Sequence, residues 1–232
     1  MKISKYNASK ILPHLVIIGG GFGGLTVAKA LKSAPIKITL VDCQNHHLFQ
    51  PLLYQVASAV LSPGDIAVPL RWVLRKQANT KILLAEVTGI DTLNKQIKII
   101  NQTLQYDMLV LATGVNHDYF GNEDWAKYAH GLKSVDDALE LRQRILMAYE
   151  QAEWSTNPED QRKLLTFVVV GGGPTGVEMA GALSEIARQT LLKDFRNIDS
   201  SDAHVVLIEG GNELLPSFRA VSYTHLTLPT KA

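Results

Sequence analysis

The residues best suited to do chemistry near the start of this chain are three glycines. Gly19, Gly21 and Gly24 have the spacing G-x-G-x-x-G, and they directly follow the apolar run 15–18. In this pattern the first glycine permits a tight turn, the second lets a pyrophosphate approach the backbone, and the third lets a helix pack closely against a strand. The free N–H groups and the dipole of the following helix favour a negative charge there. The spacing therefore predicts a phosphate-binding turn.

An acidic residue at the end of the next apolar run strengthens this prediction. The run 36–41 is followed by Asp42, which lies 18 positions after Gly24. A carboxylate at that strand end can accept hydrogen bonds from both hydroxyls of a ribose, as the dinucleotide-binding fingerprint requires. A glycine-rich turn by itself is common between a strand and a helix, so the first motif alone leaves a purely structural turn open.

The same pattern occurs a second time, far along the chain. An apolar strand pattern precedes Gly171, Gly173 and Gly176, and the next predicted strand, His204–Ile208, ends in Glu209. Two complete fingerprints are far more specific than one. Two dinucleotide sites indicate a protein that passes electrons between cofactors, for which FAD and a nicotinamide nucleotide are the natural pair. The spacing does not decide which turn holds which cofactor.

Composition limits the other classes of function. The 232 residues are 46% hydrophobic and 19% charged, as in an ordinary folded protein. A net charge of +1 offers no basic field to a nucleic acid, so no nucleic-acid partner is expected. Cys43 is the only cysteine, which excludes a redox cysteine pair, and the seven histidines are scattered, so no metal site is expected. We expect neither a signal peptide nor a transmembrane span.

Flanking patterns predict the elements that must position these residues. The fold class is α/β, with two Rossmann-like dinucleotide-binding domains, of which the second is truncated. The predicted strands are 10–18, 36–41, 81–87, 97–99, 106–114, 165–170 and 204–208. The predicted helices are 22–31, 134–150 with Ser134 as N-cap, and one after Gly176 that ends near residue 192. The segment 45–56 is open to two interpretations, a loop that leads into a helix beginning near residue 51 or a wall of the cofactor pocket. Strands 81–87 and 97–99 would form a small antiparallel meander, 106–114 a buried strand, and 157–163 a polar linker.

Several further segments match one known family. The most specific is 45–57, N-H-H-L-F-Q-P-L-L-Y-Q-V-A, because the glycine motifs are shared across a whole superfamily. The other matching segments are 16–29, 61–67, 106–114, 119–125 and 168–183. From about Leu12 to Phe218 the chain resembles the type II NADH dehydrogenases. These are non-proton-pumping NADH:quinone oxidoreductases of the pyridine nucleotide-disulfide reductase superfamily.

The resemblance implies which residues bind each cofactor. FAD would be bound at Gly19, Gly21, Phe22, Gly23, Gly24, Asp42, His47, Gln50, Pro51, Val87, Thr113 and Gly114. NADH would be bound at Gly171, Gly173, Pro174, Thr175, Gly176 and Glu209. A carboxylate at Glu209 would repel a 2′-phosphate, which favours NADH over NADPH. Glu178 would be the catalytic residue, orienting the nicotinamide or assisting protonation near the quinone, although a first-turn glutamate can also simply stabilise a helix terminus.

The resemblance also implies an organisation into domains. The FAD-binding domain would span 11–160, with a connecting helix at 134–152, and the NADH-binding domain 163–220. Because the family is much longer, the chain is expected to be an inactive N-terminal fragment without the membrane-docking C-terminal helices. Residues 221–232 fit nothing in the family and match a translated sequencing adapter, so an artefact is expected there.

The full-length protein would pass electrons to a quinone on the cytoplasmic side of the cell membrane, as a peripheral protein that could form a homodimer. Two alternatives stay open. One is a related flavoprotein reductase that uses a ferredoxin or oxygen as acceptor. The other is a non-catalytic nucleotide-binding fragment.

Overall fold

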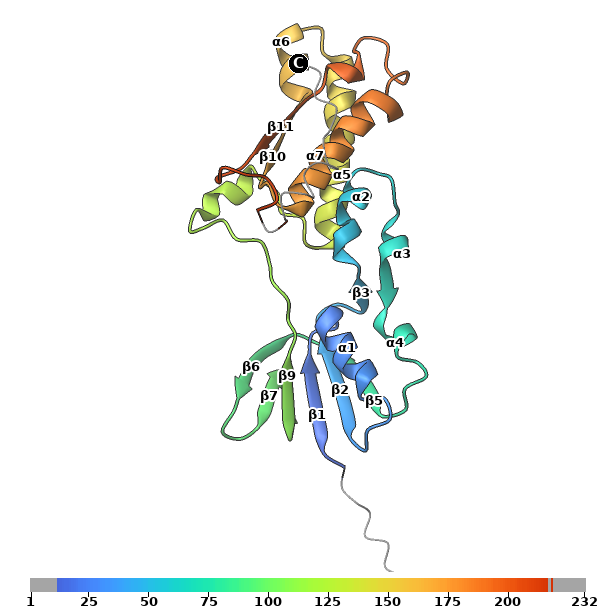
Figure 1. Ribbon diagram of the computed structural model, residues 1–232, viewed down its shortest axis with the longest axis vertical. Coiled ribbons are helices and arrows are strands. Elements are labelled where there is room, and N and C mark those ends of the chain that lie inside the picture. Colours follow the sequence, from blue (N-terminus) through green and yellow to red (C-terminus); the bar gives the residue numbers. More distant parts are fainter. Residues whose placement is uncertain (1–11, 217, 219–232) are drawn as a thin grey trace, which may run out of the picture. The chain divides into compact units, whose positions relative to one another are not determined.

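The computed structural model describes residues 12–216 and 218 and divides the chain into two compact units (Figure 1). The first unit is formed by residues 12–48 and 67–116, and the second by 49–66 and by the residues from 117 onwards. The domain boundaries at 11–160 and 163–220 stay predictions. The predicted first residues of strand 10–18, the end of the second domain and the artefact segment 221–232 lie outside the described residues.

The first unit is built on a four-stranded parallel sheet in the order β5-β2-β1-β9. Its strands are β1 His14–Ile18, β2 Lys37–Asp42, β5 Thr80–Leu84 and β9 Met108–Leu111. Ile18 lies between Val41 and Leu111, so β1, β2 and β9 end side by side at their carboxyl ends. Ligands of parallel sheets bind beyond this edge, and the first glycine turn follows β1 there.

The two faces of this sheet are covered by different elements. On one face the odd-numbered residues of β1 pack against Leu25 and Ala28 of α1, which spans Phe22–Ala30. On the other face its even-numbered residues pack against Ile97 and Ile99. Because residues 15–18 of β1 are buried on both faces, they are all apolar rather than alternating.

A small antiparallel meander lies between β5 and β9 in the sequence, as predicted. Its strands are β6 Val87–Asp91, β7 Gln96–Ile99 and β8 Gln102–Gln105. The prediction that 81–87 belongs to this meander is wrong, because residues 80–84 form β5 and pair with β2 in the parallel sheet. The cause is the side chain of Ile82, which is buried in the core beneath α1. The chain crosses from one sheet to the other only after Leu84.

The predicted buried strand 106–114 is also corrected. Its regular part is shorter, β9 Met108–Leu111, and two of its four side chains are exposed, Met108 at 44% and Leu111 at 62%. Among the described residues β9 pairs with β1 alone, so it forms an edge of the sheet. The apolar sequence indicated a strand, but an apolar run cannot distinguish a central strand from an edge strand.

A short antiparallel ribbon brings further residues to the first glycine turn. β3, His46–Leu48, pairs with β4, Ala67–Pro69. The helical turn α4, Leu70–Val73, follows β4 directly, and the side chain of Leu70 is fully buried.

The second unit repeats the order strand, glycine turn, helix and parallel strand. β10 Thr166–Val170 pairs with β11 His204–Ile208, and α7 Pro174–Glu185 packs on both strands. α2 Leu53–Ala57 packs against α5 Val135–Trp154 and against α7. The remaining helical segments are η1 Gln50–Leu52, α3 Pro63–Ile66, η2 Glu123–Lys127, α6 Pro158–Leu164, η3 Ile186–Thr190 and η4 Ser200–Asp202. The predicted α/β class and the helix start near residue 51 are confirmed.

Two predictions about the second unit need correction. The segment 157–163 is the helix α6 rather than a linker, because the Asn157 side chain accepts the N–H of Glu159 and Glu159 pairs with Lys163 at 2.9 Å. An asparagine cap followed by proline is a helix start even in a wholly polar stretch. The helix after Gly176 ends at Glu185, and a turn of π-helix, η3, continues it to Thr190.

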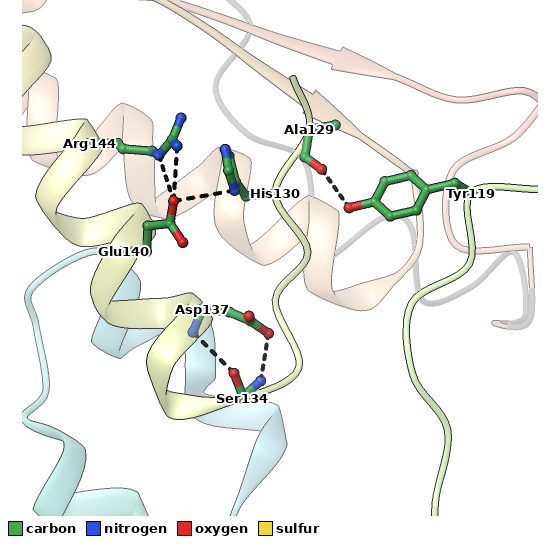
Figure 2. A network of polar contacts seen from close by, with 7 residues as sticks. All are labelled: Tyr119, Ala129, His130, Ser134, Asp137, Glu140 and Arg144. Carbon is green, nitrogen blue, oxygen red and sulfur yellow. Dashed lines mark hydrogen bonds and ion pairs between the residues drawn. The ribbon is translucent and has the colours of Figure 1, made fainter. Parts of the chain in front are cut away.

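The longest helix, α5, begins at a complete capping box (Figure 2). The hydroxyl of Ser134 accepts the N–H of Asp137, and the Asp137 carboxylate accepts the N–H of Ser134 and of Lys133 at 2.9 Å each. Burial opposes ionisation of this carboxylate, but the two backbone N–H groups and the Ser134 hydroxyl outweigh burial and hold the pKa of Asp137 below its usual value. The start predicted at Ser134 is thus confirmed.

No helix in the described part of the chain, residues 12–216 and 218, is both long enough and apolar enough to cross a membrane.

The capping box predicts a pH-dependent contribution to stability. Since folding lowers the pKa of Asp137, its contribution is fully present above the unfolded value, about 3.9, and is lost as the pH falls through the lower folded value. We expect Asp137→Asn to reduce the free energy of unfolding at pH 7 by about 1 kcal/mol and to flatten its decline below about pH 4. Denaturant unfolding over a pH series measures both effects. The neighbouring exposed substitution Asp136→Asn is the control, and equal effects of the two changes would contradict this role.

Candidate dinucleotide-binding sites

The first turn, residues 19–24, can be built only with glycine at two positions. Gly19 has a φ of +105° and donates its N–H to the carbonyl of Val41 at 2.8 Å, which ties the turn to β2. A Cβ at Gly19 would lie 2.1 Å from the carbonyl oxygen of Ala112, and one at Gly24 would lie 1.8 Å from that of Gly19. The first and third glycines are therefore required by the protein's own backbone, as the spacing predicts.

The middle glycine of the first turn is different. A Cβ at Gly21 would meet nothing within 4 Å, so packing within the protein does not require glycine there. Gly21 is the N-cap of α1, whose first N–H groups have no intrahelical partner. Open space in front of unpaired donors at a helix N-terminus fits an anionic group that approaches the backbone closely. A pyrophosphate fits this turn on these grounds.

The strand-end acid of the first unit is bonded to the turn itself. One carboxylate oxygen of Asp42 accepts the N–H of Gly20, and the other accepts the N–H of Gln44 at 2.6 Å. Each oxygen of a carboxylate has two acceptor sites, so both can still receive a ribose hydroxyl. The role of Asp42 in binding the ribose stays a prediction.

The second turn, residues 171–176, reproduces the first in the second unit. Gly171 has a φ of +107° and donates its N–H to Ile208 at 2.8 Å. A Cβ at Gly176 would lie 1.9 Å from the carbonyl oxygen of Gly171, whereas one at Gly173 would meet nothing within 4 Å. Gly173 is the N-cap of α7, and Pro174 occupies the first helical position. The exposed Thr175 follows it.

Glu209, the strand-end acid of the second unit, is hydrogen-bonded to its turn as Asp42 is to the first. Glu209 accepts the N–H of Gly172 with one carboxylate oxygen and that of Gly211 at 2.8 Å with the other. Both N–H groups lower the pKa of Glu209 below its usual value, and that of Gly211 has the larger effect. Glu209 therefore carries its negative charge at neutral pH, as the predicted exclusion of a 2′-phosphate requires.

Several other residues that the resemblance assigned to FAD surround the first turn. The Nδ1 of His47 lies 3.2 Å from the carbonyl oxygen of Gly20, and the rings of His47 and Phe22 meet edge to face at 4.9 Å. The backbone of Thr113 passes 3.1 Å from the position of a Cβ built on Gly19. Gly114, with a φ of +73°, follows it. The structure therefore gathers these side chains and backbone groups at one place.

The remaining residues assigned to FAD belong to three elements, β6, η1 and α1. Val87, at the start of β6, packs against the hydrophobic core that β1 and β2 form with the meander strand β7. Gln50 and Pro51 belong to the second unit, where the amide of Gln50 donates to the carbonyl of Lys133 at 3.3 Å. The exposed Gly23 lies within the first turn of α1. The roles of these residues in binding FAD stay predictions.

Glu178 lies on the exposed side of α7 and has a neighbour that the sequence did not single out. This neighbour is Tyr54 on α2. Burial raises the pKa of Tyr54, the hydrogen bond from Gln55 lowers it, and the negative charges of Glu178 and Glu185 raise it further. Gln55 donates to the Tyr54 hydroxyl at 3.1 Å. Tyr54 belongs to the specific stretch 45–57, but only the packing of α2 on α7 reveals this contact.

Comparisons with known proteins agree with this geometry. The family model of the pyridine nucleotide-disulphide oxidoreductases matches residues 13–225. The chain is 53% identical over 211 residues to the type II NADH:quinone oxidoreductase Ndh of Mycobacterium tuberculosis, covering 89% of this chain and 46% of the relative. It is 50% identical to NdhA of the same organism, covering 88% of this chain and 44% of the relative. The chain thus spans less than half the length of these relatives.

A solved structure gives the same result for the fold. The structure of NDH2 from Plasmodium falciparum in complex with NADH matches with a TM-score of 0.83 and 28% sequence identity. The match covers 92% of this chain and 46% of that one.

The geometry of the first turn predicts opposite effects for two adjacent substitutions. Gly24→Ala would place a methyl group against the Gly19 carbonyl and should lower the free energy of unfolding by about 1–3 kcal/mol. In Gly23→Ala the new methyl would meet only the side chain of Ala112, at 3.6 Å. Because alanine is the better helix former, this variant should be as stable as the wild type or more so. Thermal unfolding of the two variants without ligand checks the prediction, and similar stabilities would contradict it.

Proposed function

Because the chain belongs to the pyridine nucleotide-disulphide oxidoreductase family, we propose that it is the dinucleotide-binding part of a type II NADH:quinone oxidoreductase. FAD binds at the first turn and NADH at the second, and electrons pass to a quinone without proton pumping. The observation that carries the proposal is the pair of equivalent turns, in each of which a strand-end acid accepts the N–H of the residue before the N-cap glycine, Gly20 or Gly172. The 53% identity to the mycobacterial enzyme supports the choice of quinone as acceptor.

Two observations support assigning FAD to the first turn and NADH to the second. His47 and Phe22 place two flat rings beside the first turn, a suitable border for a cofactor that stays bound. At the second turn Pro174 and Thr175 stand at the positions of Phe22 and Gly23 and leave the helix start open to an exchanging ligand.

The residues of the chain bind, neutralise and orient the cofactors. The N–H groups at the starts of α1 and α7 neutralise the two pyrophosphates, and Asp42 and Glu209 hold the adenosine ribose groups. Bound FAD supplies the chemistry, since a flavin can accept a hydride from NADH and deliver electrons to a quinone. Glu178 is the catalytic residue of the proposal: from α7 it orients the nicotinamide or assists protonation near the quinone.

A membrane quinone requires access to a membrane surface, so peripheral attachment on the cytoplasmic side of the cell membrane belongs to the same proposal. A homodimer of the full-length protein is proposed with it.

Steady-state oxidation of NADH by the purified full-length protein tests the proposed activity. We expect the protein to carry FAD and to oxidise NADH faster with a soluble quinone analogue than with a ferredoxin or with oxygen. A yellow protein that prefers ferredoxin or oxygen would indicate a related flavoprotein reductase. A protein that binds nucleotides but oxidises no NADH with any of the three acceptors would contradict enzymatic function.

The charge of Glu209 predicts the choice between the two nicotinamide nucleotides. In Glu209→Gln the amide keeps the shape of the side chain but removes its repulsion of a 2′-phosphate. We expect the ratio of kcat/KM for NADPH to that for NADH to rise about tenfold, which corresponds to about 1.4 kcal/mol. Asp42→Asn is the matched control, because it alters the equivalent acid of the first turn. It should weaken FAD binding and leave the nucleotide preference unchanged, and a change of preference in both variants would contradict the assignment.

A further inference from the structure

The peptide groups around Gly20 are held from both sides. The N–H of Gly20 donates to Asp42, and its carbonyl oxygen lies 3.2 Å from the Nδ1 of His47. A carbonyl oxygen can accept a hydrogen bond but cannot donate one. The Nδ1 atom of His47 must therefore be protonated in this contact and donate to the Gly20 carbonyl. Two independent side chains from different strands thus meet the middle of the first turn.

The contact with His47 sets the direction of a donor that faces the ligand. In a planar trans peptide the Gly20 carbonyl and the Gly21 N–H belong to one rigid group and point in opposite directions. No acceptor for the Gly21 N–H is found among residues 12–216 and 218. The group that holds the carbonyl therefore determines where this N–H points.

The imidazole of His47 is itself held in place. His47 lies in the middle of β3, opposite Val68 of β4, and its ring meets Phe22 at an interplanar angle of 88°. The side chain of Leu70 fills the space next to Gly20, where a Cβ would lie 2.6 Å from a Leu70 methyl. The turn cannot rotate away from the imidazole without displacing these neighbours.

The second turn contains the same anchor, made by a different group. The carbonyl of Gly172, which corresponds to Gly20, accepts the backbone N–H of Leu215 at 2.8 Å. Both turns thus hold the carbonyl of the residue before their N-cap glycine. Only the first turn uses a side chain for this purpose, so only there can the anchor be removed by substitution.

We propose that His47 is a positioning residue of the first turn, which aims the Gly21 N–H at the pyrophosphate of the bound FAD. This role rests on the proposed function, because it requires a dinucleotide at that turn. It differs from a direct contact with the flavin ring, since His47 acts through the Gly20–Gly21 peptide.

Binding of FAD to three variants of the full-length apoprotein tests this role. His47→Leu removes the donor, His47→Asn supplies an amide N–H in a similar place, and His46→Leu removes a neighbouring histidine that contacts Asn45 at 3.2 Å. We expect His47→Leu to bind FAD about three- to tenfold more weakly, as for one lost hydrogen bond. His47→Asn and His46→Leu should bind FAD within about twofold of the wild type. The dissociation constants are measured by quenching of flavin fluorescence.

Binding of NAD⁺ to the same variants serves as an internal control, because the second turn is anchored by Leu215. Its affinity should not change in any variant. If His47→Leu does not fold, His47→Ala replaces it. The role of His47 is then judged by comparing the FAD dissociation constants of His47→Ala and His47→Asn. Wild-type FAD affinity in the variants without a donor, or no rescue by asparagine, would overturn the positioning role and leave the proposed function intact. A wild-type protein that binds NAD⁺ but no FAD would refute the proposed function and this role with it.

Discussion

The hydrogen bond from the middle of each glycine turn to a strand-end carboxylate is the interaction on which both sites depend. It joins Gly20 to Asp42 in the first unit and Gly172 to Glu209 in the second. The bond fixes the turn against the neighbouring parallel strand, so the N–H groups at the helix start are already oriented before a ligand arrives. In the proposed function it also places the acid where the ribose next to the pyrophosphate would lie.

The parts of the fold that depend on local chemistry could be predicted from the sequence. The two glycine turns, their strands and the capping box at Ser134 follow from residue types at fixed short spacings. The parts that depend on pairing partners could not. Residues 81–84 were predicted in the wrong sheet because an apolar strand does not specify its neighbour. The helix α6 was missed because its almost wholly polar sequence carries no periodic signal.

The same distinction applies to the sites. Asp42 and Glu209 were singled out from the sequence as acids that end the strand after each glycine turn, as the dinucleotide-binding fingerprint requires. The contact of His47 with Gly20, that of Leu215 with Gly172 and the proximity of Tyr54 to Glu178 join segments far apart in the sequence. Only the folded chain reveals that the two turns share a second anchor on their carbonyl side.

The central claim is that the two turns hold different dinucleotides and that electrons pass from one to the other. Mixing the FAD-loaded full-length protein with NADH in the absence of oxygen, while the visible absorbance of the flavin is followed, tests this claim most directly. The account predicts that NADH bleaches the flavin and that a quinone added afterwards restores its colour. A flavin that keeps its absorbance with saturating NADH would contradict it.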